Sequence, residues 1–230
     1  MKDDNAAVKA APSLLVLSVS ALTHVLLVWP VIYVVVLSAI KYSFFSWHPI
    51  CTTVGVCLLM TEAVFGISGE AYLNQRLSRR GRVTLHWVLH TLGLGLTIAG
   101  FAVIVVNKSW YNKDHFMTTH GQLGLSAVVV GVLVAISGIP TQNANWLYPR
   151  VSPVLLKVIH GILGIAATIL LLAATINGIY LRWWPGSEVG RDLVFASFVL
   201  ALIFLLAKPV LGAASRSRLL WRRSTRVART

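Results

Sequence analysis

Long apolar stretches separated by short polar connectors form the dominant pattern of this chain. Each stretch is long enough for the roughly 20 residues with which an α-helix crosses the hydrocarbon of a bilayer. The pattern predicts an all-α membrane protein with six transmembrane helices, at 14–39, 49–69, 83–106, 117–139, 154–178 and 192–212. We expect a short N-terminal segment over 1–13, a transmembrane domain over 14–212 and a basic tail over 213–230.

The composition excludes a soluble globular domain. Hydrophobic residues make up 57% of the 230 residues and charged residues only 12%, with a mean hydropathy of +0.76. Soluble domains carry about 25% charged residues, so this chain has too little polar surface to cover a body in water. A disordered chain requires the opposite composition and is excluded as well.

The positive charge indicates how the chain lies in the membrane. The formal net charge is +13, and most of the 20 Lys and Arg residues fall in the connectors and ends on one side. The positive-inside rule then places both termini in the cytoplasm. A basic run next to a membrane helix more often contacts anionic lipid than nucleic acid, so we expect the tail to bind lipid and no nucleic acid.

Four of the seven histidines follow a regular pattern along the chain. His48, His86, His120 and His160 open the second to the fifth predicted helix in turn. Consecutive spans run in opposite directions, so the starts of the second and fourth helices share one depth and those of the third and fifth share another. The topology therefore pairs His48 with His120 near the outer face and His86 with His160 near the inner face. Ionisable side chains inside a membrane are costly and mark functional sites.

Two imidazoles facing each other in each layer suit haem better than a bare metal ion. Zinc usually takes four protein ligands, whereas haem supplies four nitrogens and needs two axial ligands. We therefore expect two bis-histidine haem b groups in a central bundle of helices two to five, with irons roughly 18 Å apart along the membrane normal. The sequence has no C-x-x-C-H motif, so attachment would be non-covalent. Two histidine ligands favour electron transfer over oxygen activation. The alternative for each histidine is a solitary interfacial side chain bonded to a backbone carbonyl.

Three further histidines and one glutamate lie within or near the apolar stretches. His90 lies one turn from His86 on the same helix face and competes with it as a ligand. His24 lies within the first helix with no partner histidine at its depth, which favours a buried hydrogen bond over ligation. Glu62 falls near the inner layer, where either arginines or the haem edge would face it. Near the outer layer, His115 is either solvated or in contact with a substrate.

Glycines follow two of the four histidines and have two interpretations. Small residues near a ligand leave room for a flat macrocycle, but they also allow membrane helices to pack closely. For the heptad stripe on the fourth helix we favour close packing. The glycines concerned are Gly121 and Gly124 after His120, Gly161 and Gly164 after His160, and the stripe Gly124, Gly131 and Gly138.

Several of these motifs together resemble the cytochrome b561 family. They are Phe45-Ser46-Trp47-His48-Pro49, Met60-Thr61-Glu62-Ala63, His86, His120-Gly121-Gln122-Leu123-Gly124 and His160-Gly161-Ile162-Leu163-Gly164. The resemblance covers residues 14–212. The short termini and the Thr-Glu-Ala variant are most similar to the small animal branch, the domain-containing transmembrane reductases.

The resemblance implies a transmembrane oxidoreductase with two b haems. The matching positions place the inner haem on His86 and His160 and the outer haem on His48 and His120, with no catalytic residue beyond these ligands. Cytosolic ascorbate is the implied electron donor, and monodehydroascorbate or ferric chelates on the other side are the implied acceptors. A homodimer stays open, and so does the choice among endoplasmic reticulum, endosomal or vesicle, and plasma membranes.

Basic residues near each haem layer are candidates for substrate attraction, since ascorbate is an anion and a cationic surface concentrates anions. The positive-inside rule is the alternative explanation for the arginines on the inner side. The candidates are Arg79, Arg80, Arg82 and Arg150 on the inner side, and Lys108, Lys113 and His115 on the outer side.

Two other functions fit intramembrane histidines. One is a multi-pass transporter that uses them for protons or metal ions. The other is a haem-binding scaffold without turnover of its own. We favour transmembrane electron transfer because four histidines at two matched depths suit a chain of redox centres.

Overall fold

The predicted all-helical architecture is confirmed by a computed structural model, which describes residues 13–68 and 77–227. Within these residues, six helical segments are long and apolar enough to cross a membrane. The second span is built from three consecutive segments. The helices are α1 (Leu14–Ile40), α2 (Trp47–Thr52), η2 (Thr53–Met60), α3 (Thr61–Ser68), α5 (Arg79–Trp110), α6 (Thr119–Gln142), α7 (Pro153–Ile179) and α8 (Glu188–Val227).

Two helices extend well beyond their apolar stretches. Helix α5 begins at Arg79, where the Ser78 hydroxyl caps it by accepting from the Gly81 backbone N–H at 3.1 Å. Helix α8 continues to Val227, through the part of the basic tail that the structure describes. That tail consists largely of Ala, Arg, Leu and Ser and has no Pro or Gly after Gly212, so nothing in its sequence ends the helix.

The second span crosses α5 with the two backbones nearly in contact. A Cβ atom added to Gly55 would lie 2.6 Å from the Gly93 carbonyl oxygen, and one added to Gly93 would lie 2.7 Å from the Gly55 carbonyl oxygen. Only glycine allows this approach, which is the usual role of small residues between membrane helices. Residues Thr53–Met60 of this span form a π-helix, a conformation that is often found at functional sites.

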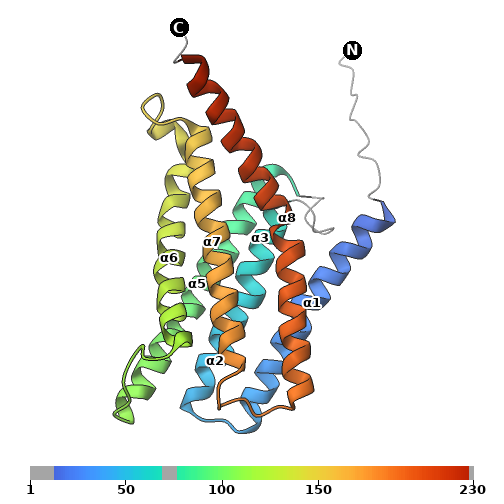
Figure 1. Cartoon of the computed structure of the whole chain (residues 1–230), viewed down its shortest axis with the longest axis vertical. Helices are drawn as coiled ribbons and strands as arrows, with labels where there is room; N and C mark the ends of the chain where they lie inside the picture. Colours follow the sequence, from blue (N-terminus) through green and yellow to red (C-terminus); the bar gives the residue numbers. More distant parts are fainter. Residues whose placement is uncertain (1–12, 69–76, 228–230) are drawn as a thin grey trace.

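The helices form an elongated bundle (Figure 1). Helices α6 and α7 pack along each other over most of their length, and the second span packs on α5. Helices α1 and α8 contact each other and flank the second span and α7, where Leu27, Cys57, Leu172 and Phe198 are buried.

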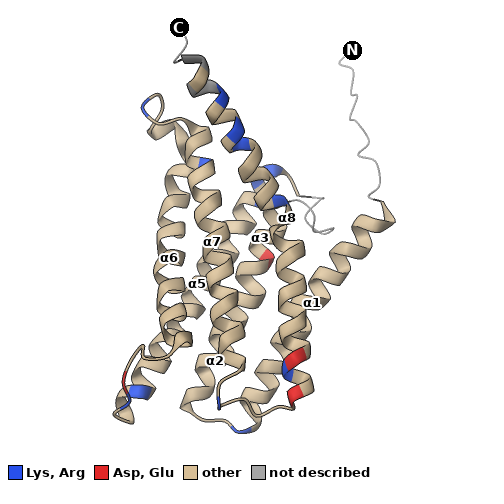
Figure 2. Cartoon of the chain, viewed as in Figure 1, with Lys and Arg blue, Asp and Glu red and all other residues tan. Residues whose placement is uncertain are grey.

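Charge is distributed unevenly between the two ends of the bundle. Helix α1 begins and α8 ends at the same end, and Lys and Arg gather there on the start of α5 and the last part of α8 (Figure 2). We call this the inner end, and the opposite one the outer end. The distribution is what the positive-inside rule expects of a cytoplasmic face, and the cytoplasmic location of the termini stays a prediction.

Candidate functional site

Near the outer end, one histidine from the second span meets one from α6. His48 and His120 have ring centroids 5.9 Å apart, with an angle of 83° between the ring planes. The Nδ1 atom of His48 donates to the Gly100 carbonyl on α5 at 2.9 Å, and Nδ1 of His120 donates to the Ala174 carbonyl on α7 at 2.9 Å. Four spans therefore hold this pair in place.

A second pair lies nearer the inner end, on α5 and α7. The ring centroids of His86 and His160 are 6.4 Å apart, with an interplanar angle of 77°. His86 Nδ1 donates to the Ala63 carbonyl at 3.0 Å. His160 Nδ1 lies 3.0 Å from the Ser137 hydroxyl, which donates its own proton to the Val134 carbonyl at 2.8 Å and so accepts from the imidazole. The same four spans thus contribute to this pair as well.

The hydrogen bonds at Nδ1 decide which ring nitrogen is free. A carbonyl oxygen only accepts, and the Ser137 hydroxyl already donates its proton to Val134. The proton of each neutral imidazole must therefore sit on Nδ1, which leaves a lone pair on Nε2. Each layer then contains two neighbouring rings with an unprotonated Nε2, and two such nitrogens cannot hydrogen-bond to each other. A metal ion between them would satisfy both, and an Nδ1–H bonded to a carbonyl is the usual way in which proteins orient a ligating histidine.

The spacing of each pair fits an iron with two axial imidazoles. Metal–nitrogen bonds of about 2.0–2.1 Å, with about 1.1 Å from nitrogen to ring centre, put the two centroids about 6.3 Å apart. The observed separations are 5.9 and 6.4 Å. Among the described residues, no group of three or more His, Cys, Asp or Glu side chains gathers as a bare metal ion would require. The donor set therefore suits haem, which supplies its other four ligands.

Glycines leave open space beside the histidines. Gly124 lies one turn after His120 and Gly164 one turn after His160, each on the face of its histidine. A Cβ atom added to either glycine would meet no other heavy atom within 4 Å. The stripe on α6 has a different role towards the inner end, where a Cβ at Gly138 would lie 3.4 Å from the His160 ring. The two interpretations of these glycines therefore apply at different positions.

The two layers are the same distance apart on two different helices. Gly100, the partner of the outer histidine His48, lies 14 residues after His86 on α5. Ala174, the partner of His120, lies 14 residues after His160 on α7. At 1.5 Å per residue, this spacing separates the layers by about 21 Å, close to the roughly 18 Å expected from the sequence.

His90 contacts the inner pair without replacing either member. Its ring centroid lies 4.5 Å from that of His86, nearly perpendicular at 74°. The ring facing His160 is that of His86. The geometry therefore supports His86 as the ligand and assigns His90 to the wall of the site.

The sequence interpretation of Glu62 needs correction, and that of His24 is extended. The sequence suggested arginines or the haem edge as the neighbours of Glu62. In the structure its partner is His24 on α1, whose Nδ1 lies 2.7 Å from the Glu62 Oε1. The expected hydrogen bond of His24 is confirmed with Glu62 as its partner, and the two side chains are partly buried. The Nε2 atom of His24 is buried without a hydrogen-bond partner among the described residues, and its ring packs edge-on against Phe65 at 5.3 Å. The rotation of α1 about its axis decides this contact, and the sequence does not reveal that rotation.

This pair yields a first prediction, on stability. Replacing Glu62 with Leu leaves His24 without its partner inside the membrane and should lower the free energy of unfolding by about 2 kcal/mol, the usual cost of leaving a buried polar group unsatisfied. The double variant His24→Phe with Glu62→Leu should recover most of that loss. Thermal unfolding of the purified protein in detergent measures both. A single variant as stable as the wild type would show that the contact contributes nothing.

The four inner candidates for substrate attraction lie at the inner end. Arg82 and Arg79 lie one and two turns before His86 on its side of α5, with Arg82 half-buried and Arg79 exposed. Arg80 is exposed on the same turn, and Arg150 is exposed in the connector between α6 and α7. Arg82 and Arg79 are thus the two that line up with the inner pair.

The three outer candidates lie at the end of α5, which carries Lys108, and in the connector between α5 and α6, which carries Lys113 and His115. The Lys108 ammonium donates to the Asp114 carbonyl at 2.7 Å, and the Lys113 ammonium lies 5.6 Å from the centre of the Tyr111 ring. His115 Nε2 is 3.3 Å from the Ser109 hydroxyl. Each of the three side chains thus has a contact at the end of α5 or in the connector.

The described residues contain six segments that can cross a membrane, and they pair histidines at two depths. These two features are typical of multi-pass helical membrane proteins that hold redox centres within a helix bundle. The chain belongs to the cytochrome b561 family: the sequence model described as eukaryotic cytochrome b561 matches residues 47–185. It is therefore a haem-containing membrane oxidoreductase that transfers electrons across the bilayer.

Curated relatives agree with this assignment. The human protein named transmembrane reductase CYB561D2 is 34% identical over 174 residues, covering 74% of this chain and 76% of the relative. The mouse protein of the same name is 33% identical over the same length and shares. No solved structure matches the chain significantly.

Proposed function

We propose that the chain holds two non-covalent haem b groups and passes single electrons from cytosolic ascorbate to monodehydroascorbate or ferric chelates on the other side. His86 and His160 hold the inner haem, and His48 and His120 hold the outer one. One observation carries the proposal: in each layer, Nδ1–H bonds leave two Nε2 lone pairs on rings spaced as axial ligands.

The protein's own contribution is to fix the ligands and exclude other chemistry. The hydrogen bonds at Nδ1 hold each imidazole in one tautomer and raise its basicity as a ligand. When bound, haem supplies a reversible one-electron couple at its iron. Two histidines as ligands of each haem would leave oxygen no open position on the iron, which would favour electron transfer.

Arginines at the inner end suit an anionic donor. Arg79 and Arg82 extend from the inner pair towards the inner end, and exposed Arg80 and Arg150 add to the positive field there. Such a field raises the local concentration of an anion such as ascorbate and its rate of encounter. The ammonium groups of Lys108 and Lys113, together with His115, would act in the same way on an anionic acceptor at the outer end.

The extension of α8 suits a lipid partner. Arg216, Arg218 and Arg222 are exposed on the part of α8 that continues past the apolar stretch. A basic segment directly beside a membrane is attracted to anionic lipid by about 1 kcal/mol per cationic residue. A homodimer stays a prediction.

The absorption spectrum of the purified protein tests the proposal. We expect two haem b per chain by the pyridine haemochrome assay and reduction of both by ascorbate. A transporter of protons or metal ions would carry no haem, and a scaffold would carry haem that ascorbate does not reduce. Either result would exclude the proposed function.

A further inference from the structure

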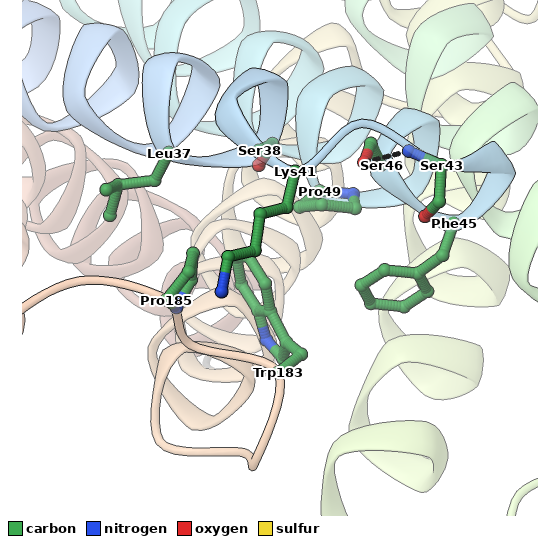
Figure 3. Close-up of a pocket in the computed structure, with 9 residues that line it drawn as sticks. All are labelled: Leu37, Ser38, Lys41, Ser43, Phe45, Ser46, Pro49, Trp183 and Pro185. Carbon is green, nitrogen blue, oxygen red and sulfur yellow. Dashed lines mark hydrogen bonds between the residues drawn. The ribbon is translucent and has the colours of Figure 1, made fainter.

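A small cavity opens at the outer end, and its lining does not include Lys108, Lys113 or His115. Its volume is about 120 Å³. It lies between the segment that joins α1 to α2 and the loop that joins α7 to α8 (Figure 3). The lining residues used below are Lys41, Phe45, Ser46 and Trp183.

The cavity contains a cation that is free to bind an anion. Lys41 and Phe45 project from the α1–α2 segment towards the loop that carries Trp183 (Figure 3). Among the described residues, Lys41 has no hydrogen bond or ion pair. The nearby Arg191 differs, since its guanidinium lies 3.9 Å from Glu188, 3.7 Å from Asp192 and 4.7 Å from the centre of the Tyr180 ring.

Aromatic walls connect the cavity to both outer histidines. The Phe45 ring lies 5.9 Å from the His48 ring and 5.9 Å from the Trp183 ring. The Trp183 indole N–H donates to the Gly178 carbonyl at 2.7 Å. Gly178 in turn lies against His120, since a Cβ placed there would be 2.9 Å from the imidazole Cε1. The Phe45 ring thus lies between the cavity and His48, and the Trp183 ring with the Gly178 backbone lies between the cavity and His120.

We propose that Lys41, Phe45 and Trp183 form the outer binding pocket for a small organic anion that accepts one electron. The inference rests on the proposed function and identifies its acceptor site. Pockets for drug-sized ligands begin at roughly 300 Å³, so this cavity suits a single small ring with one negative charge better than a bulky ferric chelate. Of the acceptors considered above, monodehydroascorbate has that size and charge.

The reaction at this pocket balances with water as the only further reactant. The radical anion gains one electron, which the haem that His48 and His120 would hold would supply. It takes one proton and leaves as the closed-shell ascorbate anion. The lining residues include no carboxylate and no histidine, so the proton comes from the outer water, either directly or through the Lys41 ammonium, which water then reprotonates.

Chemical labelling tests binding at the pocket without any electron transfer. The full-length protein in nanodiscs is acetylated with a sulfosuccinimidyl ester, and the rate at each lysine is followed by mass spectrometry. Ascorbate, the closed-shell product, should slow acetylation of Lys41 by at least threefold and slow Lys108 and Lys113 less. Equal rates at Lys41 with and without ascorbate, or protection at Lys113 alone, would overturn the proposal. The assay also works on haem-free protein, so its result does not depend on whether the protein transfers electrons.

Stopped-flow reoxidation of the reduced protein tests the same pocket kinetically, with acceptors of opposite charge. The variant Lys41→Gln should be reoxidised about tenfold more slowly by monodehydroascorbate, and no more slowly by the cationic hexaammineruthenium(III). The variant Lys41→Arg keeps the charge and should keep the wild-type rate.

An equal loss with both acceptors would indicate general damage to the outer end and would overturn the proposal, as would an unchanged rate in Lys41→Gln. Loss of rate in Lys113→Gln alone would place the acceptor at the α5–α6 connector instead. Failure of the proposed function would give a different result: the wild-type protein would contain no haem, or ascorbate would not reduce its haem.

Discussion

Replacing His120 with Ala should remove the outer haem and leave the inner haem in place. The purified variant should contain one haem b per chain in place of two. The reason is that His120 and His48 face each other with Nε2 as the free nitrogen of each ring, so one of them alone leaves the iron with a single axial ligand. The remaining haem should still be reduced by ascorbate, because the inner pair is intact about 21 Å away. Electron transfer to an acceptor outside should fall to background.

The matched substitutions make the pairing itself testable. His48→Ala should have the same spectrum and haem content as His120→Ala, whereas His160→Ala and His86→Ala should lose the other haem and most of the reduction by ascorbate. His90→Ala should retain both haems, since its ring is not the one that faces His160. If His48→Ala and His120→Ala lost different haems, the assignment of the layers would be wrong. Redox titration followed by visible spectroscopy distinguishes the two haems.

The six spans could be predicted because a membrane helix must bury its backbone polar groups in its own hydrogen bonds and show apolar side chains to lipid. The ends of the helices could not be predicted in the same way. Hydropathy reports contact with lipid, whereas a helix ends where caps and backbone preferences end it. Ser78 starts α5 before its apolar stretch, and α8 continues through residues that are polar but favour a helix.

The depth of each histidine could also be predicted, because the direction of consecutive spans puts alternate helix starts at the same level. The groups that accept a hydrogen bond from Nδ1 of each histidine could not be predicted. Gly100, Ala63 and Ala174 contribute only a backbone carbonyl, and every residue has one. The pocket around Lys41 and Trp183 escaped sequence reasoning because its walls come from two connectors far apart in the chain. A tryptophan at a span end is most simply interpreted as an interfacial anchor.

A substitution outside the ligand set should also empty the outer centre. A Cβ atom at Gly178 on α7 would lie 2.9 Å from Cε1 and 3.2 Å from Nδ1 of His120, closer than packed atoms tolerate. In Gly178→Ala the imidazole must therefore turn or shift, which breaks the bond from its Nδ1 to the Ala174 carbonyl. Loss of such a supporting bond weakens a metal site by about 10–100-fold.

We expect purified Gly178→Ala to lose the outer haem on dilution or gel filtration while it retains the inner haem and its reduction by ascorbate. Gly138→Ala is the matched control, because its new methyl would lie 3.4 Å from the His160 ring, which a small shift accommodates. That variant should keep two haems per chain. Because both changes add one methyl group to a membrane helix beside a histidine, a difference between them reports the fit around the imidazole and not helix stability in general. Two stably bound haems in Gly178→Ala, with the outer potential unchanged, would show that the His120 ring does not occupy the position that the hydrogen bond to Ala174 gives it.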